Sequence, residues 1–307
     1  MSMAMIQGSV SLGLMWAFMA LGVYITYRIL EMPDLTAEGS IILGAGLASR
    51  WVADGIDPIV ATTAAAGVGS LAGLVTGILH TKLEIPPILA GILTMVGSYS
   101  VALRIMTTSN VSLLHIRTIF SPFQDMGLNN RDAAIVLGGG LVIILIAILY
   151  WFFGTELGSA IRATGNNKNM ARAIGINIDN MVILGLMISN GIIGLAGALV
   201  SQNHGFASVD MGGGTIATGL ASVIIAEVLI RARKFWLRLF SVALGAIVYR
   251  IIIALVLQMG MHPNDLRLFR ALTVAFILTW PIIKRKFNAK FPSLSLAKSS
   301  AKEQGGQ

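Results

Sequence analysis

"SLGLMWAFMALGVYITYRIL" (residues 11–30) is a 20-residue apolar stretch in which Arg28 is the only charged residue. That length is what an α-helix needs to cross about 30 Å of hydrocarbon. A second stretch, "AAIVLGGGLVIILIAILYWFFG" (133–154), has the same character. The whole chain of 307 residues is 55% hydrophobic and only 12% charged, with a mean hydropathy of +0.80. A soluble domain carries about a quarter charged residues, so the sequence predicts an all-α polytopic membrane protein.

The apolar runs predict nine membrane segments, within a range of about 8–10 helices. They lie at 8–30, 37–54, 57–80, 87–106, 133–153, 181–201, 213–231, 236–258 and 268–283. No Lys or Arg precedes Arg28, so the positive region of a secretory signal peptide is missing and we expect the first segment to stay in the membrane. Residues 1–287 are expected to form one membrane domain, and the Ser/Lys-rich residues 288–307 a disordered cytoplasmic tail.

Charge distribution predicts an orientation. Residues 28–36, 80–86, 154–180, 231–238 and the tail from 284 fall on one side by alternation, and they hold 15 of the 22 basic residues, including all eight lysines. Positive charge favours the cytoplasmic side, which leaves the N-terminus outside and the C-terminus inside. Five arginines fall near the outer loops and count against this assignment: Arg104, Arg117, Arg131, Arg267 and Arg270.

Two parts of the chain repeat a pattern. "LGLM" at 12–15 and at 184–187 is followed in each case by an Asp with glycines behind it (Asp34, Asp210) and then by "GLAS" at 46–49 and 219–222. An odd number of segments separates the copies, so a genuine duplication would place them with inverted topology, a recurrent transporter design. The second and seventh segments, short and Gly-rich at their starts, are then candidates for broken helices. Chance matching of small apolar words is the alternative.

Two glycine ridges indicate close helix packing, because small residues let helices approach each other in lipid. Packing within one chain is favoured over a subunit interface. The ridges consist of Gly69, Gly73 and Gly77 and of Gly191, Gly194 and Gly197.

Ionisable residues in membrane segments are costly and suggest function. Snorkelling or local pairing, such as Glu227 with Arg231 four residues on, accounts for most of them. Arg250, in the middle of "ALGAIVYRIIIALVL", is a candidate path or inter-helix residue. The acids at 31, 34 and 38 are interpreted first as helix caps, with Asp34 or Thr36 preceding the first turn.

Motifs for catalysis and metals are missing from the sequence. The chain has no cysteine, its four histidines are scattered, and no Ser/His/Asp, HExxH or P-loop pattern occurs. We therefore expect no enzyme activity, no metal and no nucleic-acid partner. Any ATP and Mg²⁺ that drive the protein would bind to another chain.

The polar stretch 154–180 stands out between two apolar runs. Its core, "LGSAIRATGNNKNMARAIGIN" (157–177), predicts short helices that break at Gly165-Asn166 and end at Gly175. Arg162, Lys168 and Arg172 would form a basic side opposite small and apolar residues. Docking in a groove of a partner protein is favoured over a flexible linker.

This stretch, with "GIIGLAGALVSQ" (191–202) and "GFASVDMGGGTIATGLASVI" (205–224), resembles the membrane subunits of ATP-binding-cassette importers of the branched-chain amino acid, ribose and nucleoside class. The Pro-Asp-Leu-Thr element at 33–36 is similar to that of a less characterised subfamily with lipoprotein-type binding proteins, which has been linked to aromatic amino acids. The resemblance implies that the loop is the coupling helix that docks on a cytoplasmic ATPase. The positions matching that pattern are Gly158, Ala163, Gly165, Met170, Ala171 and Gly175.

The resemblance implies a permease subunit in a bacterial-type inner membrane, with an extracytoplasmic binding protein and a second permease copy as partners. Candidate residues of the substrate path lie at the repeated helix starts, where backbone N–H groups can meet a carboxylate. They are Asp34, Thr36, Glu38, Asp210 and Thr215. An amino acid is the expected solute. A sugar or nucleoside permease, or an ion-coupled carrier that needs no ATPase, are the alternatives.

Overall fold

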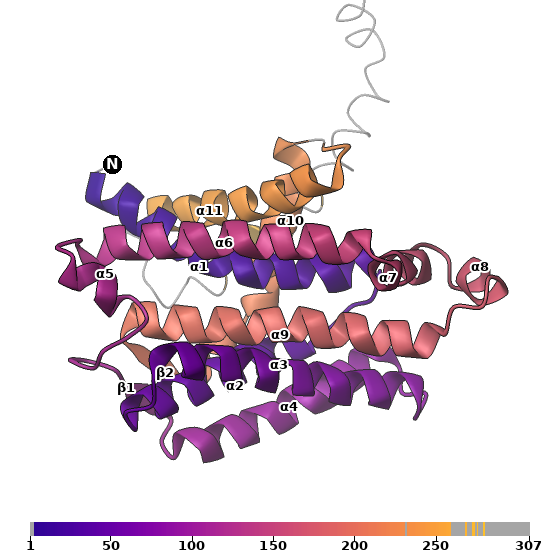
Figure 1. Cartoon of the computed structure of the whole chain (residues 1–307), viewed down its shortest axis with the longest axis horizontal. Helices are drawn as coiled ribbons and strands as arrows, with labels where there is room; N and C mark the ends of the chain where they lie inside the picture. The colour runs from indigo at the N-terminus through magenta and orange to yellow at the C-terminus, as the bar shows by residue number, and fades with distance from the viewer. Residues whose placement is uncertain are drawn as a thin grey trace, which may run out of the picture.

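The computed structural model describes residues 3–230 and 232–258, with a few isolated positions up to 279. It is a bundle of long helices that run roughly side by side, with short elements at both ends (Figure 1). The elements are α1 (Met3–Tyr24), the π-helix η1 (Ile25–Ile29), α2 (Thr36–Ala53), α3 (Pro58–Thr81), α4 (Pro87–Met106), β1 (Asn110–Ser112), α5 (Ser121–Asp125), α6 (Asn130–Gly154), α7 (Glu156–Asn166), α8 (Lys168–Ala173), α9 (Ile178–His204), β2 (Phe206–Ser208), the 3₁₀-helix η2 (Val209–Gly212), α10 (Thr215–Leu229) and α11 (Phe235–Gln258).

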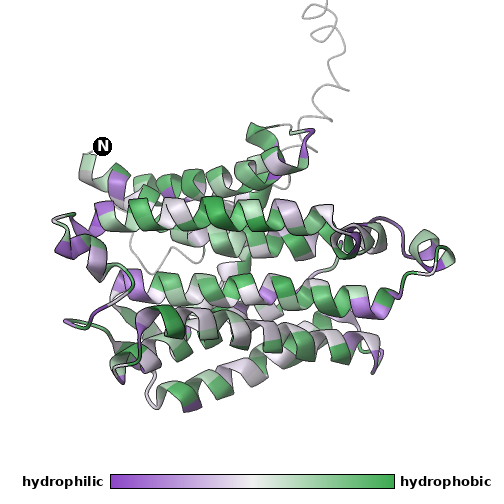
Figure 2. Ribbon diagram, in the orientation of Figure 1, coloured by the Kyte–Doolittle hydropathy of each residue, from purple (hydrophilic) through white to green (hydrophobic). Residues whose placement is uncertain are grey.

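Within the described residues, seven helical stretches are long and apolar enough to cross a membrane. An eighth helix, α2, fills the second predicted segment and is enclosed by its neighbours, with buried residues along most of its length. Hydrophobic residues cover the long helices, and hydrophilic ones gather at the loops (Figure 2). The all-α polytopic fold is confirmed. The predicted segment 268–283 and the tail 288–307 lie outside the described residues.

The two repeat units run in opposite directions. Gly22 of α1 lies against Ile193 of α9, whereas Leu30, which follows α1, lies against the earlier Gly185, so α1 and α9 are antiparallel. The helices that follow them also run in opposite directions. α2 runs parallel to α9, where Ser40 contacts Asn190 and Gly44 contacts Gly194. α10 runs parallel to α1 and η1, where Gly219 contacts Val23 and Glu227 contacts Arg28. Both following helices are short, with 18 residues in α2 and 15 in α10. The inverted arrangement expected from the repeat is therefore present.

The two glycine ridges pack against each other inside the chain. A Cβ added to Gly69 of α3 would lie 3.1 Å from the Cα of Gly194 of α9, and one added to Gly194 would lie 2.5 Å from the carbonyl oxygen of Ala65. Gly197 lies against α2, where an added Cβ would lie 2.9 Å from the backbone nitrogen of Ala45. Because lipid offers no hydrophobic drive between helices, such backbone contact supplies the van der Waals energy that holds α3, α9 and α2 together.

The loops lie at the two ends of the helix bundle. At the end that carries α7 and α8, Lys82 after α3 forms an ion pair with Asp179 of α9 at 3.0 Å. At the opposite end β1 pairs antiparallel with β2, and Gln202 hydrogen-bonds to Thr62 and to the backbone of Ile119. Of the loops that the charge pattern assigns to one side, those that the structure describes meet at the α7/α8 end: Lys82 pairs with Asp179, and residues 28, 166, 233 and 238 line one pocket.

Arg231, the expected partner of Glu227, lies outside the described residues. Among the described residues, the carboxylate of Glu227 accepts two hydrogen bonds from Arg28 of η1. The sequence argument considered only neighbours on one helix, whereas helix packing brings residues 199 positions apart into contact.

Candidate functional site

A cavity of about 400 Å³ opens between α2, α4 and η2. It brings together two of the predicted path residues, one from each repeat unit: Glu38 on α2 and Asp210 on η2. The rest of its wall is mostly apolar and includes an exposed tyrosine. These residues are Ile42, Met95, Val96, Tyr99, Ser100, Val209, Gly212 and Gly213. The arrangement combines negative charge with an apolar and aromatic surface.

Glu38 links the starts of the two short helices. Its carboxylate accepts a hydrogen bond of 3.0 Å from the backbone N–H of Gly214, immediately before α10. Gly214 adopts φ +75°, which glycine tolerates without strain. A helix N-terminus carries partial positive charge and unpaired N–H groups, so it favours an anion. The chain's own carboxylate thus fills the anion position of α10.

Asp34 precedes α2, the helix that carries Glu38, but it does not line the cavity. Its side chain is 4% exposed and accepts hydrogen bonds from the backbone N–H of Thr36 at 2.9 Å and from the amide of Asn190 at 2.7 Å. The amide oxygen of Asn190 in turn accepts from the hydroxyl of Ser40 at 2.7 Å. A buried carboxylate without partners is costly, and this network supplies them. Asp34 therefore fixes the start of α2 against α9.

The other predicted path residues are also apart from the cavity. Thr36 is fully buried and shares a 2.6 Å hydrogen bond with Thr76 of α3. Thr215 is fully buried and donates to the carbonyl of Gly212 at 2.9 Å. The guanidinium of Arg250 lies 4.1 Å from the ring centre of Trp16, between α11 and α1. These side chains support the helices rather than line the cavity.

The stretch 154–180 forms two short helices. The side chain of Thr155 caps α7, and that of Asn167 caps α8 by accepting from the N–H of Met170 at 3.0 Å. The break falls at Asn167, next to the expected Gly165-Asn166, and Gly175 with φ +84° follows α8. Asn167 ends one helix and begins the next because its side chain replaces a missing backbone partner.

The apolar side of α7 faces its own chain. Ile161 and Thr164 are fully buried, whereas Arg162 is exposed. The apolar side of α7 thus packs mainly on its own chain, although Leu157 is 51% exposed. On α8, Ala171 is buried, Arg172 is exposed, and Met170 is 53% exposed. The predicted docking residues that remain exposed are thus Arg162, Met170, Arg172 and Gly175.

Gly165 brings α7 into backbone contact with η1. A Cβ on Gly165 would lie 2.8 Å from the carbonyl carbon of Ile29 and 3.0 Å from the Cα of Leu30. Ala163 beside it is half-buried, and Gly158 lies against the backbone of Phe152 and Phe153 where α6 ends. Any movement of α7 therefore acts on the segment that leads into α2.

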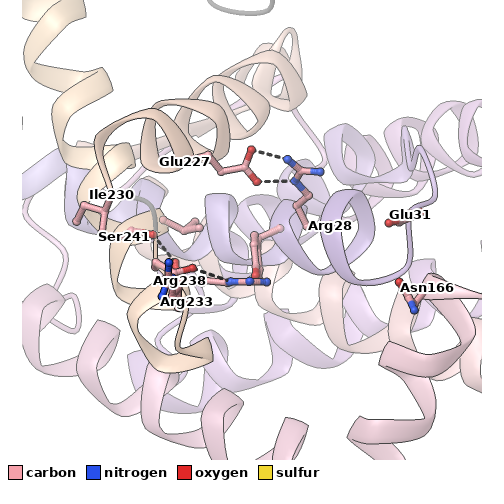
Figure 3. Close-up of a pocket in the computed structure, with 11 residues that line it drawn as sticks. Arg28, Glu31, Asn166, Glu227, Ile230, Arg233, Arg238 and Ser241 are labelled. Carbon is pink, nitrogen blue, oxygen red and sulfur yellow. Dashed lines mark hydrogen bonds and ion pairs between the residues drawn. The ribbon is translucent and has the colours of Figure 1, made fainter. Parts of the chain in front are cut away.

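A polar pocket of about 620 Å³ adjoins this contact (Figure 3). Figure 3 shows Arg28 and Glu227 joined directly by two hydrogen bonds, with Glu31 and Asn166 of α7 on the other side of Arg28. Arg238 of α11 donates to the carbonyl of Ala232 at 3.1 Å. The pocket thus lies between α1, η1, α7, α10 and α11, and the ion pair of Arg28 with Glu227 joins η1 to α10.

Sequence reasoning missed Asn190, Tyr99 and the partner of Glu227. Asn190 lies in the middle of the apolar run 181–201. A polar side chain inside a membrane segment is costly, so it could have been recognised from the sequence as a candidate functional or structural residue. Tyr99 carries no such signal, because a tyrosine in a membrane segment is common. In the part of the chain that the structure describes, no group of three His, Asp or Glu residues could hold a metal ion.

Comparison with known proteins identifies relatives over most of the chain. The family model described as the permease component of branched-chain amino acid transport systems matches residues 5–279. The tyrosine transport system permease protein of Clostridioides difficile (strain R20291) is 41% identical over 280 residues, which is 90% of this chain and 92% of that protein.

More distant relatives belong to other transport systems. The probable branched-chain amino acid transport permease protein LivH of Methanocaldococcus jannaschii is 23% identical over 64% of this chain and 65% of its own length. The autoinducer 2 import system permease protein LsrC of Escherichia coli (strain K12 / DH10B) is 26% identical over 73% of this chain and 63% of its own length. No solved structure matches the chain. With its family model covering nearly all of the membrane helices, this chain belongs to the permease components of ATP-binding-cassette transport systems of the branched-chain amino acid class.

Proposed function

We propose that this permease imports an aromatic amino acid, with L-tyrosine as the first compound to test. A relative at 41% identity over most of both chains is named for tyrosine transport. The observation that carries the substrate class is the cavity in which Glu38 and Asp210 adjoin Tyr99 and Met95. Carboxylates suit the ammonium group of an amino acid, and aromatic and thioether groups suit an aromatic side chain.

The hydrogen bond from Gly214 to Glu38 suggests how the cavity receives a zwitterion. A substrate carboxylate would replace the carboxylate of Glu38 at the N-terminus of α10, which favours either anion. Glu38, once released, would pair with the substrate ammonium together with Asp210. The cost of breaking one internal hydrogen bond is then offset by two new charge-assisted ones.

The energy is proposed to come from a separate ATPase that binds ATP and Mg²⁺ and docks on α7 and α8. Closure of that ATPase would move α7, and the contact of Gly165 with Ile29 would pass the movement to η1 and α2. This is gating by rigid-body movement. Two permease copies would enclose the path, and an extracytoplasmic binding protein would deliver the solute.

The orientation follows from the basic loops. They meet at the α7/α8 end, so we assign this end to the cytoplasm of a bacterial-type inner membrane. The N-terminus is then outside and the C-terminus inside. Residues 1–287 act as the membrane domain, and residues 288–307 as a cytoplasmic tail.

Uptake into proteoliposomes tests the substrate. The permease, its ATPase and its binding protein are reconstituted, and uptake of labelled L-tyrosine is compared with that of leucine, ribose and a nucleoside. Glu38→Gln is expected to reduce the uptake rate at least about ten-fold, whereas Asp132→Asn on α6, away from the cavity, leaves it unchanged. Equal uptake by both variants, or transport of ribose or a nucleoside instead of tyrosine, would contradict the proposal.

Co-purification in detergent tests the docking surface. Met170→Asp with Arg172→Glu changes two exposed side chains of α8. We expect the double variant to fold but to lose the ATPase. Arg131→Glu makes a similar charge change on an exposed residue at the other end of the bundle, and it should retain the ATPase. Retention by the α8 variant would refute the docking assignment.

A further inference from the structure

A second pocket, of about 810 Å³, lies where α6 ends and α11 begins. It differs from the cavity at Glu38 in position and in charge. Nine residues line it, and none of them is an acid. They are Tyr150, Trp151, Phe153, Gly154 and Thr155 from the end of α6, Arg162 from α7, and Lys234, Phe235 and Trp236 at the start of α11.

Three of its aromatic rings are exposed on helices that are candidate membrane spans. Trp151 is 71% exposed, Tyr150 is 52% exposed and Trp236 is 46% exposed. Trp and Tyr concentrate at the boundary between hydrocarbon and water, because their rings have an apolar body and a polar group. Their presence at the ends of α6 and α11 sets the level of the membrane surface at this pocket.

The charged side chains that line the pocket, at the level of the membrane surface, are both basic. Arg162 and Lys234 are both exposed. The guanidinium of Arg162 lies 5.6 Å from the ring centre of Phe235, so a cation–π contact holds it at the pocket. Basic groups between membrane helices attract the headgroups of anionic lipids.

We propose that this pocket binds the headgroup of an anionic phospholipid. Arg162 and Lys234 bind its phosphate, and Trp151 and Trp236 pack beside its glycerol and the first acyl carbons. The lipid would connect α6, α7 and α11 and so brace α7 from the membrane side. The proposal rests on the membrane location of the chain and is independent of which solute is carried.

Native mass spectrometry of the full-length permease in detergent tests this. The protein is incubated with phosphatidylglycerol, with phosphatidylcholine, or with phosphatidylglycerol plus excess glycerol 3-phosphate. We expect retention of phosphatidylglycerol over phosphatidylcholine and no displacement by glycerol 3-phosphate. Lys234→Gln should reduce the retained phosphatidylglycerol about five-fold, since it removes one of two cations, and Lys234→Arg should retain it.

Lys82→Gln is the matched control, because Lys82 is an exposed lysine at the same end of the bundle that pairs with Asp179. It should bind phosphatidylglycerol as the wild type does. Equal retention of both lipids, or equal losses in Lys234→Gln and Lys82→Gln, would overturn the proposal. Displacement by glycerol 3-phosphate would assign the site to a soluble phosphate, and release of the lipid on adding the ATPase would assign the pocket to that protein.

Discussion

Substitution of Gly165 by alanine should uncouple the permease from its ATPase. The added Cβ would overlap the carbonyl oxygen of Ile29 and would lie 2.8 Å from its carbonyl carbon. Non-bonded heavy atoms pack at about 3.5–4.0 Å, so α7 must move away from η1 by more than about 1 Å. Overpacking of this kind costs about 1–3 kcal/mol, which corresponds to a factor of about 5–150 in an equilibrium.

That strain acts against the packed position of α7, whereas alanine favours the helix itself by about 0.8–1 kcal/mol over glycine. We therefore expect a net loss of stability of at most about 2 kcal/mol and an about 5- to 150-fold loss of solute transported per ATP hydrolysed. The assay measures uptake and phosphate release in the same proteoliposomes. Gly139→Ala on α6, where an added Cβ meets nothing within 4 Å, is the control. If the two variants transport equally well, the contact of α7 with η1 does not carry coupling.

Three further predictions concern stability in detergent. Gly69→Ala should lower the free energy of unfolding by about 1–3 kcal/mol, because its Cβ would meet the backbone of α9. Gly67→Ala is the control, because its Cβ would point into open space. Equal melting temperatures of the two variants would contradict the packing of α3 on α9. Asn190→Leu should lower the free energy of unfolding by at least about 1–3 kcal/mol, since the buried Asp34 loses a hydrogen-bond partner. A melting temperature at or above that of the wild type would show that Asp34 does not need the amide of Asn190. Arg28→Gln should change stability by less than about 1 kcal/mol, because the ion pair with Glu227 is 46% and 39% exposed, and a larger loss would mean that the pair is shielded in the assembled protein.

The helices were predictable from the sequence because apolar length and proline positions mark them. The segment expected at 57–80 is α3 (Pro58–Thr81), and the one expected at 87–106 is α4 (Pro87–Met106). Proline fits the first helical turn, where its missing N–H has no partner to lose. Asn167 and Gly175 likewise mark the ends of α7 and α8 through local chemistry.

The site was only partly predictable. The repeat pointed to both helix starts, but it did not show that Glu38 and Asp210 line a cavity while Asp34 is buried against Asn190. That difference depends on which face of α2 meets α9. Packing between distant helices decides it, and a single sequence does not display such packing. The same holds for the pairing of Arg28 with Glu227.

The central claim is that a separate ATPase drives this permease, and ATP-dependent uptake of L-tyrosine tests it most directly. Proteoliposomes are prepared with the permease and binding protein, either with or without the ATPase, and ionophores are added to abolish ion gradients. We predict uptake only with the ATPase and ATP, with no effect of the ionophores. Uptake without the ATPase that stops when the proton or sodium gradient is abolished would show an ion-coupled carrier and contradict the account.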